Sequence, residues 1–188
     1  MNAPIESLGL VHQACWLELQ HAARQRGHPF RLMALGTVAD AAGGAEAEVR
    51  HVVVREVHPE TKSLVFFTDA RSPKVAQMRA HPRGTLLAWS ERLGWQLRLR
   101  VALTVETEGL GVSSRWARLK MSPAAHDYLS PLPPGTPVVE RFVPERATRE
   151  HFSVVTARIE AFDWLELHAD GHRRAHFDAD GNGQWLVP

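Results

Sequence analysis

The spacing of hydrophobic residues divides the chain into an opening helical segment and a longer segment dominated by strands. Between residues 6 and 26, apolar side chains recur every three or four positions, the spacing of one face of an amphipathic helix. These apolar residues are Leu8, Val11, Cys15, Leu19 and Ala22. Gly27 and Pro29 follow, so the helix is predicted to end before residue 27.

From residue 30 onward, the chain consists of short runs rich in Val, Leu, Phe, Trp and Thr, separated by turn-forming residues. The predicted strands are residues 30–38, 48–57, 63–69, 84–90, 95–108, 151–162, 164–169, 172–177 and 185–188. In the fifth run Leu97 and Leu99 alternate with polar side chains such as Arg98, so one face packs and the other meets solvent or a ligand. Most strands follow one another directly, which predicts a mainly β (α+β) antiparallel barrel with flanking helices.

Two helical regions interrupt the strands. The first is predicted over residues 72–81, because this segment opens with a Ser-Pro pair and Pro82 follows it. The second, residues 113–128, is predicted as two short helices that are broken near Pro123 and followed by a Pro-rich connection.

Length and charge narrow the class of protein. The length of 188 residues predicts one domain, residues 1–188, with a helix in residues 1–27 and the barrel with its flanking helices in residues 30–188. The 22 Lys and Arg against 21 Asp and Glu leave a net charge of +1, which predicts neither a nucleic-acid nor a membrane partner. A single cysteine allows no internal disulfide, and no apolar run is long enough to span a membrane, so we expect a cytoplasmic protein.

Candidate chemistry begins in residues 66–74, FFTDARSPK, where a strand is predicted to end and a helix to begin. A helix start presents unpaired N–H groups and a partial positive charge, both of which favour an anion. Arg71 and Lys74 add full positive charges beside it. The alternative is that Ser72 only caps the helix and that both cations are solvated.

A second candidate is the strand RHVVVR, in which two cations bracket an apolar centre. It comprises Arg50, His51, Val52, Val53, Val54 and Arg55. A regular strand would send the side chains of residues 50 and 55 to opposite faces, although its backbone groups could still line a flat ligand. The alternative is an ordinary strand with solvated ends.

Together these segments resemble the pyridoxamine 5'-phosphate oxidase family of FMN-binding split barrels, and in particular its pyridoxamine phosphate oxidase-related branch. The family's first motif is an Arg, three or four apolar residues and a Lys or Arg, as in residues 50–55. Its second motif is an aromatic-Thr pair followed by Ser-x-Lys, as in residues 67–74, and Trp164 and Arg174 match a Trp and an Arg ten residues apart. The resemblance implies a six-stranded antiparallel split β-barrel with flanking helices and an FMN cofactor.

The resemblance also implies roles for individual residues. The implied FMN contacts are Arg50, His51, Val52, Val53, Val54, Arg55, Phe67, Thr68, Arg71, Ser72, Lys74, Gln96, Trp164 and Arg174. Arg50, Lys74 and the helix start would hold the phosphate, and Gln96 would hydrogen-bond the flavin edge. Family members are homodimers with the cofactor at the subunit interface, which implies that Trp164 and Arg174 act from the partner subunit.

The substrate-binding motifs depart from the family pattern. Residues 113–130 show no recognisable Tyr-x-x-x-Arg-Pro-x-x-Ser, the family's clamp for the substrate phosphate, and PLPPG at residues 131–135 replaces the Gln-Ser pair that follows it. Asp170, Gly171 and His172 replace an Arg-x-His, and a carboxylate there would repel a phosphate. We therefore expect a flavin-dependent oxidoreductase whose small-molecule substrate is not pyridoxamine phosphate, with His172 as a substrate contact.

Other functions are weighed against this one. The missing clamp leaves open a non-catalytic FMN-binding or small-ligand-binding protein, such as a carrier or sensor, or a barrel without flavin that serves as an interaction domain. His168, His172 and His176 recur every four residues, but Gly171 predicts a turn between them, so no metal site is expected. The sequence contains no Gly-x-Ser-x-Gly elbow of a hydrolase, and the alternating strand pattern of residues 92–100 argues against a single-stranded nucleic-acid groove.

Overall fold

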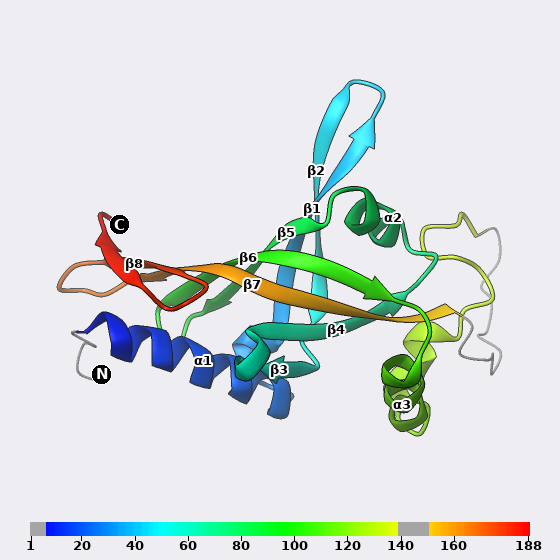
Figure 1. The fold of residues 1–188 in the computed structure, drawn as a ribbon, viewed down its shortest axis with the longest axis horizontal. Coiled ribbons are helices and arrows are strands. Elements are labelled where there is room, and N and C mark those ends of the chain that lie inside the picture. Colours follow the sequence, from blue (N-terminus) through cyan, green and yellow to red (C-terminus); the bar gives the residue numbers. More distant parts are fainter. Residues whose placement is uncertain (1–6, 139–150) are drawn as a thin grey trace.

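The computed structural model describes residues 7–138 and 151–188, which form a strongly curved sheet with three flanking helices (Figure 1). The helices are α1 (Leu8–Arg24), α2 (Pro73–Ala80) and α3 (Leu110–Leu119), with the 3₁₀ helices η1 (Pro29–Arg31), η2 (Pro59–Thr61) and η3 (Pro123–Tyr128). The strands are β1 (Leu32–Ala41), β2 (Gly44–Val53), β3 (Glu56–His58), β4 (Ser63–Asp69), β5 (Arg83–Ser90), β6 (Trp95–Glu106), β7 (Phe152–Glu166), β8 (Arg173–Asp178) and β9 (Gly183–Leu186). No helix in the described ranges has both the length and the apolar character that crossing a bilayer requires.

The strands form one antiparallel sheet in the order β2-β1-β5-β6-β7-β4-β3, with β8 beside β7 and β9 beside β8. Because β2 and β3 end the series, the described sheet is open, as in a split barrel. The predicted mainly β fold is confirmed. Strands β1, β2, β4, β5, β6 and β7 supply the six expected strands, and β3, β8 and β9 are additional.

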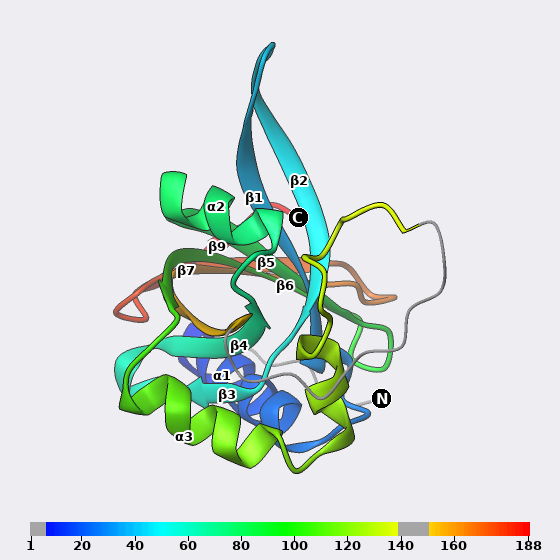
Figure 2. The ribbon, with the colours of Figure 1, turned by 90° about the vertical axis from the view of Figure 1, so that its right-hand side faces the viewer.

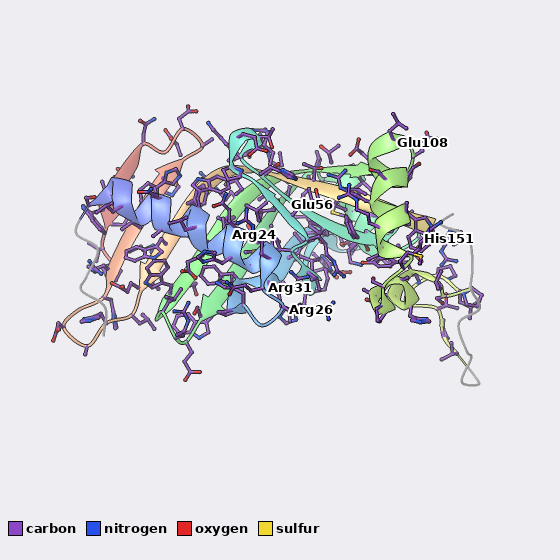
Figure 3. All side chains as sticks on the ribbon, turned by 90° about the horizontal axis from the view of Figure 1, so that it is seen from below. Arg24, Arg26, Arg31, Glu56, Glu108 and His151 are labelled. Atoms are coloured by element: carbon purple, nitrogen blue, oxygen red, sulfur yellow. The ribbon has the colours of Figure 1, made fainter. Side chains whose placement is uncertain are left out.

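Helix α1 packs its apolar stripe against the core of the barrel. The fully buried residues of this stripe are Val11, Cys15, Leu19 and Ala22. At the start of the helix, the hydroxyl of Ser7 accepts the N–H of Leu10 at 3.2 Å. At its end, Arg31 donates to the carbonyls of Ala22 and Ala23 at 3.1 and 2.9 Å, at the place where Figure 3 labels Arg31. The predicted helix is confirmed within the described residues, which exclude residue 6.

Strand β4 is buried on both faces, which explains its nearly unbroken apolar run. Leu64 and Phe66 face the main core beneath α1. Val65 faces a second core, which Trp116 of α3 and Phe152 of β7 help to form. The helices α3 and η3 that cover this second core confirm the two predicted short helices near Pro123.

The single strand predicted over residues 48–57 is wrong, because the chain changes its partner strand in the middle of that segment. Strand β2 ends at Val53, and the N–H of Val54 donates to the carbonyl of Arg31 at 2.8 Å. The next N–H, that of Arg55, donates to the carbonyl of Val65 in β4 at 2.8 Å, and β3 then pairs with β4. Arg50 and Arg55 consequently belong to different parts of the barrel.

The β1–β2 hairpin projects from the body of the protein beside α2 (Figures 1 and 2). Strand β1 pairs with β5 only over residues 34–36. At this crossing a Cβ on Gly84 would lie 2.8 Å from the carbonyl oxygen of Gly36. This distance is too short for any side chain, so the crossing requires glycine. Just beyond this crossing β1 contacts α2, where Thr37 donates to Gln77 at 2.7 Å.

Candidate functional site

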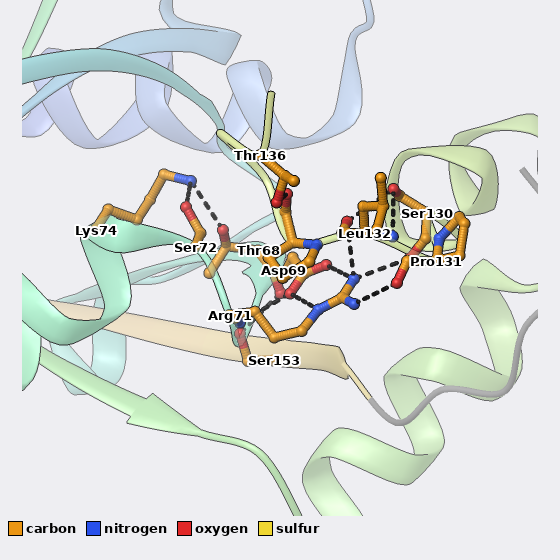
Figure 4. A network of polar contacts seen from close by, with 11 residues as sticks. Thr68, Asp69, Arg71, Ser72, Lys74, Ser130, Pro131, Leu132, Thr136 and Ser153 are labelled. Atoms are coloured by element: carbon orange, nitrogen blue, oxygen red, sulfur yellow. Dashed lines mark hydrogen bonds and ion pairs between the residues drawn. The ribbon is translucent and has the colours of Figure 1, made fainter. Parts of the chain in front are cut away.

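The turn between β4 and α2 brings a lysine and two hydroxyl groups together. The ammonium nitrogen of Lys74 donates to Ser72 Oγ at 2.7 Å and to Thr68 Oγ1 at 3.1 Å (Figure 4). Both hydroxyl residues are buried, and Lys74 is half-buried. The side chain of Ser72 makes no capping hydrogen bond to α2, so the alternative in which it only caps the helix is wrong.

Arg50 reaches the same region from β2. It pairs with Leu35 of β1, and its guanidinium donates to Thr37 Oγ1 and, at 2.9 Å, to Gln77 Oε1 of α2. A further contact at 2.6 Å joins it to the exposed carboxylate of Glu48. Thr37 and Gln77 are themselves hydrogen-bonded at 2.7 Å and buried, so they fix the guanidinium against α2. We call Arg50, Thr68, Ser72 and Lys74 the basic cluster.

The basic cluster carries more positive than negative charge in a partly dry environment. Burial lowers the pKa of Lys74, the nearby charge of Arg50 lowers it further, and Asp69 opposes this shift. An ammonium group placed at a helix N-terminus also opposes the helix dipole. An anion with several oxygens would relieve all three costs, because it would neutralise Lys74 and Arg50 and accept hydrogen bonds from both hydroxyls. The residues present therefore fit a phosphate group.

Arg71, expected at the phosphate, points elsewhere. Its guanidinium forms a two-pronged ion pair with Asp69 and also donates to backbone carbonyls of residues 130–132 (Figure 4). These contacts turn the positive charge of Arg71 away from Lys74.

Arg55 lies at the other end of the motif, over an aromatic ring. Its guanidinium carbon is 5.9 Å from the centre of the Phe67 ring, and its buried Nε has no hydrogen-bond partner. The only tyrosine of the chain, Tyr128, lies close by: burial raises the pKa of its hydroxyl, and the charge of Arg55 opposes that rise. Arg55 is thus a partly buried cation with hydrogen-bonding capacity to spare.

A hollow of about 240 Å³ opens beside Arg55, between β3 and α3. Its lining residues, which we call the arginine hollow, are Arg55, Glu56, Phe67, Arg115, Arg118, Leu119 and Ser122. Arg115 forms a two-pronged ion pair with Glu56 at 2.9 and 2.7 Å, and Figure 3 shows Glu56 between the end of α1 and α3. The three arginines exceed the one carboxylate by two charges, so the hollow favours an anion.

This hollow corrects one sequence-based expectation. Arg118 and Ser122 have the spacing of the Arg and Ser in Tyr-x-x-x-Arg-Pro-x-x-Ser, with Ser114 at the position of the Tyr. The pattern was missed because Ser and Leu replace its Tyr and Pro, and only the fold shows that Arg118 and Ser122 face Arg55.

Gln96 and Arg174 lie in one row on the outer face of the sheet, and Trp164 does not. Leu165 of β7 pairs with Gln96 on one side and with Arg174 on the other. Arg174 also binds Asp163 at 3.1 and 2.8 Å; burial alone would raise the pKa of Asp163, but the hydrogen bonds from its arginines bring it below its ordinary value. Trp164 points into the core, fully buried, and its indole N–H has no acceptor.

The remaining expected residues divide between core and surface. Val52 and Val54 are buried in the main core, whereas His51 is exposed on β2. His172 lies exposed in the β7–β8 turn, where its Nδ1 accepts the N–H of His168 at 3.3 Å. The structure therefore does not place His172 beside the basic cluster or the arginine hollow.

One group of potential metal ligands, Glu18, His21 and His28, lies within 4.8 Å in the described part of the chain. His28 Nδ1 accepts the N–H of Phe30 at 3.1 Å, so its Nε2 carries the proton that it donates to Glu18 at 2.9 Å. A metal bound at Nε2 would shift the ring proton to Nδ1. Nδ1 could then no longer accept the N–H of Phe30, the hydrogen bond that begins η1. We interpret the group as a structural tie between α1 and η1.

The open antiparallel sheet with a phosphate-compatible turn defines the class of FMN-binding split barrels. The family model of the pyridoxamine 5'-phosphate oxidase FMN-binding domain matches residues 13–107, and the chain belongs to this family. None of the curated proteins compared with the chain matches it.

Solved structures agree with this assignment. A pyridoxamine 5'-phosphate oxidase-related FMN-binding protein from Nostoc punctiforme PCC 73102 matches with a TM-score of 0.71 at 22% identity, over all of both chains. PhzG from Burkholderia lata 383, in complex with tetrahydrophenazine-1-carboxylic acid, matches with 0.69 at 17% identity over 100% of this chain and 99% of that chain. A protein related to general stress protein 26 from Clostridium acetobutylicum matches with 0.56 at 11% identity over 94% of this chain and 98% of its own. At these identities the likeness establishes the fold alone.

Proposed function

We propose that the protein is a homodimeric, FMN-dependent oxidoreductase that acts on a small organic molecule with an anionic group. The main support is the basic cluster, in which a half-buried Lys74 donates to two buried hydroxyls at a helix start and Arg50 is anchored on Gln77 of the same helix. A dianionic phosphate ester is the ligand that this set of donors would stabilise most.

The FMN contacts in this proposal follow the two strand segments that lead away from the basic cluster. Arg50, Thr68, Ser72 and Lys74 hold the phosphate. The backbone from Val52 to Arg55 and the backbone of Phe67 border the rest of the cofactor.

The homodimer is part of the proposal because the second set of expected contacts lies on the other face of the sheet. Leu35, which pairs with Arg50, and Thr37, two residues further along β1, point inward, whereas Gln96 and Arg174 lie on the outer face. One chain therefore could not apply both sets to the same cofactor, but two chains related by a twofold axis could.

The outer face also has the apolar surface that such an interface needs. Leu32, Leu87 and Trp89 expose 52%, 37% and 46% of their surfaces on strands β1 and β5. Trp89 pairs with Gln96 across β5 and β6, so the apolar patch and the expected flavin contact adjoin each other. Burial of exposed aromatic and aliphatic groups is the usual core of a protein interface.

Bound FMN supplies the redox chemistry, because N5 of its isoalloxazine exchanges a hydride with an organic molecule. The chain contributes orientation and charge. The arginine hollow adjoins Arg55, so Arg118, Ser122 and Arg55 can bind an anionic group of a substrate and hold its other end towards the flavin site. A built substrate subsite beside the cofactor strand favours an enzyme over a carrier or sensor.

The test begins with the absorbance spectrum of freshly purified protein and the mass of the released chromophore. We expect flavin bands, an FMN mass, and bleaching of the bands on anaerobic addition of NADH or NADPH with recovery in air. Dithionite, which reduces any accessible flavin, is the chemical control. A colourless protein that takes up no added FMN would reject the cofactor. FMN that is bound but reduced only by dithionite, and by neither NADH nor NADPH, would support the carrier or sensor instead.

A further inference from the structure

We propose that Asp69 and Arg71 act as a positioning pair that fastens the Pro-rich connection, residues 130–136, to the turn that carries the basic cluster. The role in cofactor binding rests on the proposed function, whereas the fastening itself does not. Arg71 would then influence the flavin through the connection that it holds and not through its own charge.

The guanidinium of Arg71 uses its donors on two partners (Figure 4). Nε and Nη2 donate to the two carboxylate oxygens of Asp69 at 3.0 and 2.7 Å. Towards the connection, Nη2 donates to the carbonyls of Ser130 and Leu132 at 2.9 and 3.4 Å, and Nη1 donates to that of Pro131 at 3.1 Å. The planar five-donor fork of arginine suits this pattern, and the ammonium of a lysine could not reproduce it.

Asp69 is built into the turn before α2. Its side chain is 5% exposed, and Oδ1 also accepts the backbone N–H of Arg71 at 2.8 Å. Its backbone carbonyl accepts the N–H of Ser72 at 3.0 Å, so the residue that holds Arg71 also shapes the start of the basic cluster. The hydrogen bonds that Arg71 donates to Asp69 raise the pKa of Arg71, and the pair carries no net charge to offer a phosphate.

The connection has few other means of attachment. Residues 131, 133 and 134 are prolines, which lack the N–H needed to join a strand or helix. The hydrogen bonds inside the connection are local: Ser130 Oγ donates to the carbonyl of Leu132 at 2.8 Å, and Thr136 Oγ1 donates to that of Pro133 at 2.8 Å. A proline-rich segment still has backbone carbonyls that accept hydrogen bonds, and Arg71 donates to the carbonyls of three successive residues.

The fastening matters for the site because the connection begins at the second core. Tyr128 and Leu129, which directly precede Ser130, are buried in that core, and Tyr128 lies beside Arg55. The pair therefore joins the phosphate end of the site to the wall behind Arg55. Releasing the connection would disturb both ends, whereas removing one phosphate ligand would disturb only the first.

Three variants separate a positioning role from a direct charge effect: Arg71→Lys, Arg71→Ala and Asp69→Asn, with the exposed Arg79→Lys of α2 as the matched control. Amide hydrogen exchange of a peptide covering residues 128–138 in cofactor-free protein reports the fastening, and titration with FMN reports its effect on the site. We expect all three variants to exchange about tenfold faster or more in this peptide, as loss of hydrogen bonds to a charged group implies. We also expect Arg71→Lys to lose as much FMN affinity as Arg71→Ala.

Other results of the same measurements would contradict the proposal. Recovery of FMN affinity in Arg71→Lys with unchanged exchange in the peptide would show that Arg71 acts through its charge and would overturn the proposal. Unchanged exchange in Asp69→Asn would overturn it as well. If the wild-type protein binds no FMN, the proposed function fails, but the exchange measurement still decides whether the pair fastens the connection.

Discussion

The ammonium nitrogen of Lys74 lies 2.7 Å from the hydroxyl oxygen of Ser72, so the residue that precedes α2 and the first charged residue of that helix are bound to each other. This contact removes the Ser72 hydroxyl from its usual role as a helix cap. It also keeps a cation at the positive end of the helix dipole, which is unfavourable without a bound anion.

Replacement of Lys74 by methionine is expected to separate stability from cofactor binding. FMN affinity should fall by about 1.5–3 kcal/mol, the range for a hydrogen bond to a charged group. The lowered pKa of Lys74 means that the folded chain binds its proton less tightly than the unfolded chain, so the charged form costs stability below its ordinary pKa. Cofactor-free Lys74→Met should therefore melt at or above the wild-type temperature at neutral pH.

Thermal unfolding with and without FMN, together with a fluorescence titration, checks this pair of outcomes. Lys120→Met is the matched control, because Lys120 is an exposed residue at the C-terminal end of α3 and should change neither value. A Lys74→Met protein that binds FMN like the wild type would show that the phosphate does not lie at the basic cluster.

Arg118→Met should weaken the binding of anions in the arginine hollow and leave FMN affinity unchanged. Arg118 lines the hollow, whose lining residues include none of the basic cluster, and it is also distant from that cluster in sequence. Inorganic phosphate and benzoate serve as probes, and their binding to the FMN-loaded protein is followed by the flavin difference spectrum. We expect a loss of about tenfold in probe affinity; the exposed Arg26→Met, in the loop after α1, is the control. Equal probe affinity in both variants would remove the hollow from the proposed site.

Trp89→Asp should abolish dimer formation and weaken FMN binding at the same time. Trp89 exposes 46% of its surface beside Gln96, and a charge there would have to be buried in the interface. Sedimentation and FMN titration measure the two effects. Leu110→Asp, at a residue that is 90% exposed on α3, should change neither. A monomeric variant with full FMN affinity would show that one chain forms the complete site.

Glu56→Gln should reduce the amount of folding stability that the protein loses as the pH falls into the acidic range. Hydrogen bonds from Arg115 are the main cause that lowers the pKa of Glu56, against the opposing effect of burial. A carboxylate with a lowered pKa stabilises the folded state above its ordinary value near 4.5, and this contribution is lost as pH falls through the lower folded value. The wild type should thus lose more stability than the variant on acidification, as measured by denaturant unfolding. Glu60→Gln, an exposed neighbour, should follow the wild type.

The thiol of Cys15 should be inert in the folded protein. It is fully buried against the barrel, and this burial strongly raises its pKa, so almost no thiolate forms near neutral pH. A chromogenic disulfide reagent should react with one thiol per chain in denaturant and with none before unfolding. Rapid reaction of the native protein would show that α1 detaches from the core.

Periodicity predicted most of the fold because its strands and helices have strong local patterns. The apolar stripe of α1 and the alternation around Leu97 both correspond to buried faces. The break after Val53 could not be predicted, because residues 48–57 read as one apolar strand and only the competing partner, β4, divides them.

The grouping of the candidate residues was predictable where they are close in sequence and unpredictable where the fold joins distant segments. Thr68, Ser72 and Lys74 lie in one turn, and they meet as expected. The contact of Arg50 with Gln77 joins residues that are 27 positions apart, and no local signal marks Gln77.

The motif spacing of Trp164 and Arg174 misled for a different reason. Trp164 pairs with Ala175, and Arg174 pairs with Leu165, so the hairpin register sends the two side chains to opposite faces. A spacing in sequence carries no information on register until the turn between the strands is known.

Because the chain changes its partner strand at Val54, the segment between Arg50 and Arg55 connects two different parts of the barrel and limits the distance between them. These two residues mark the phosphate end and the substrate end of the proposed site, and five residue steps join them. An extended chain of that length spans at most about 17 Å. In the proposed site, the polypeptide itself therefore limits the distance between the cation at the phosphate end and the cation beside the arginine hollow.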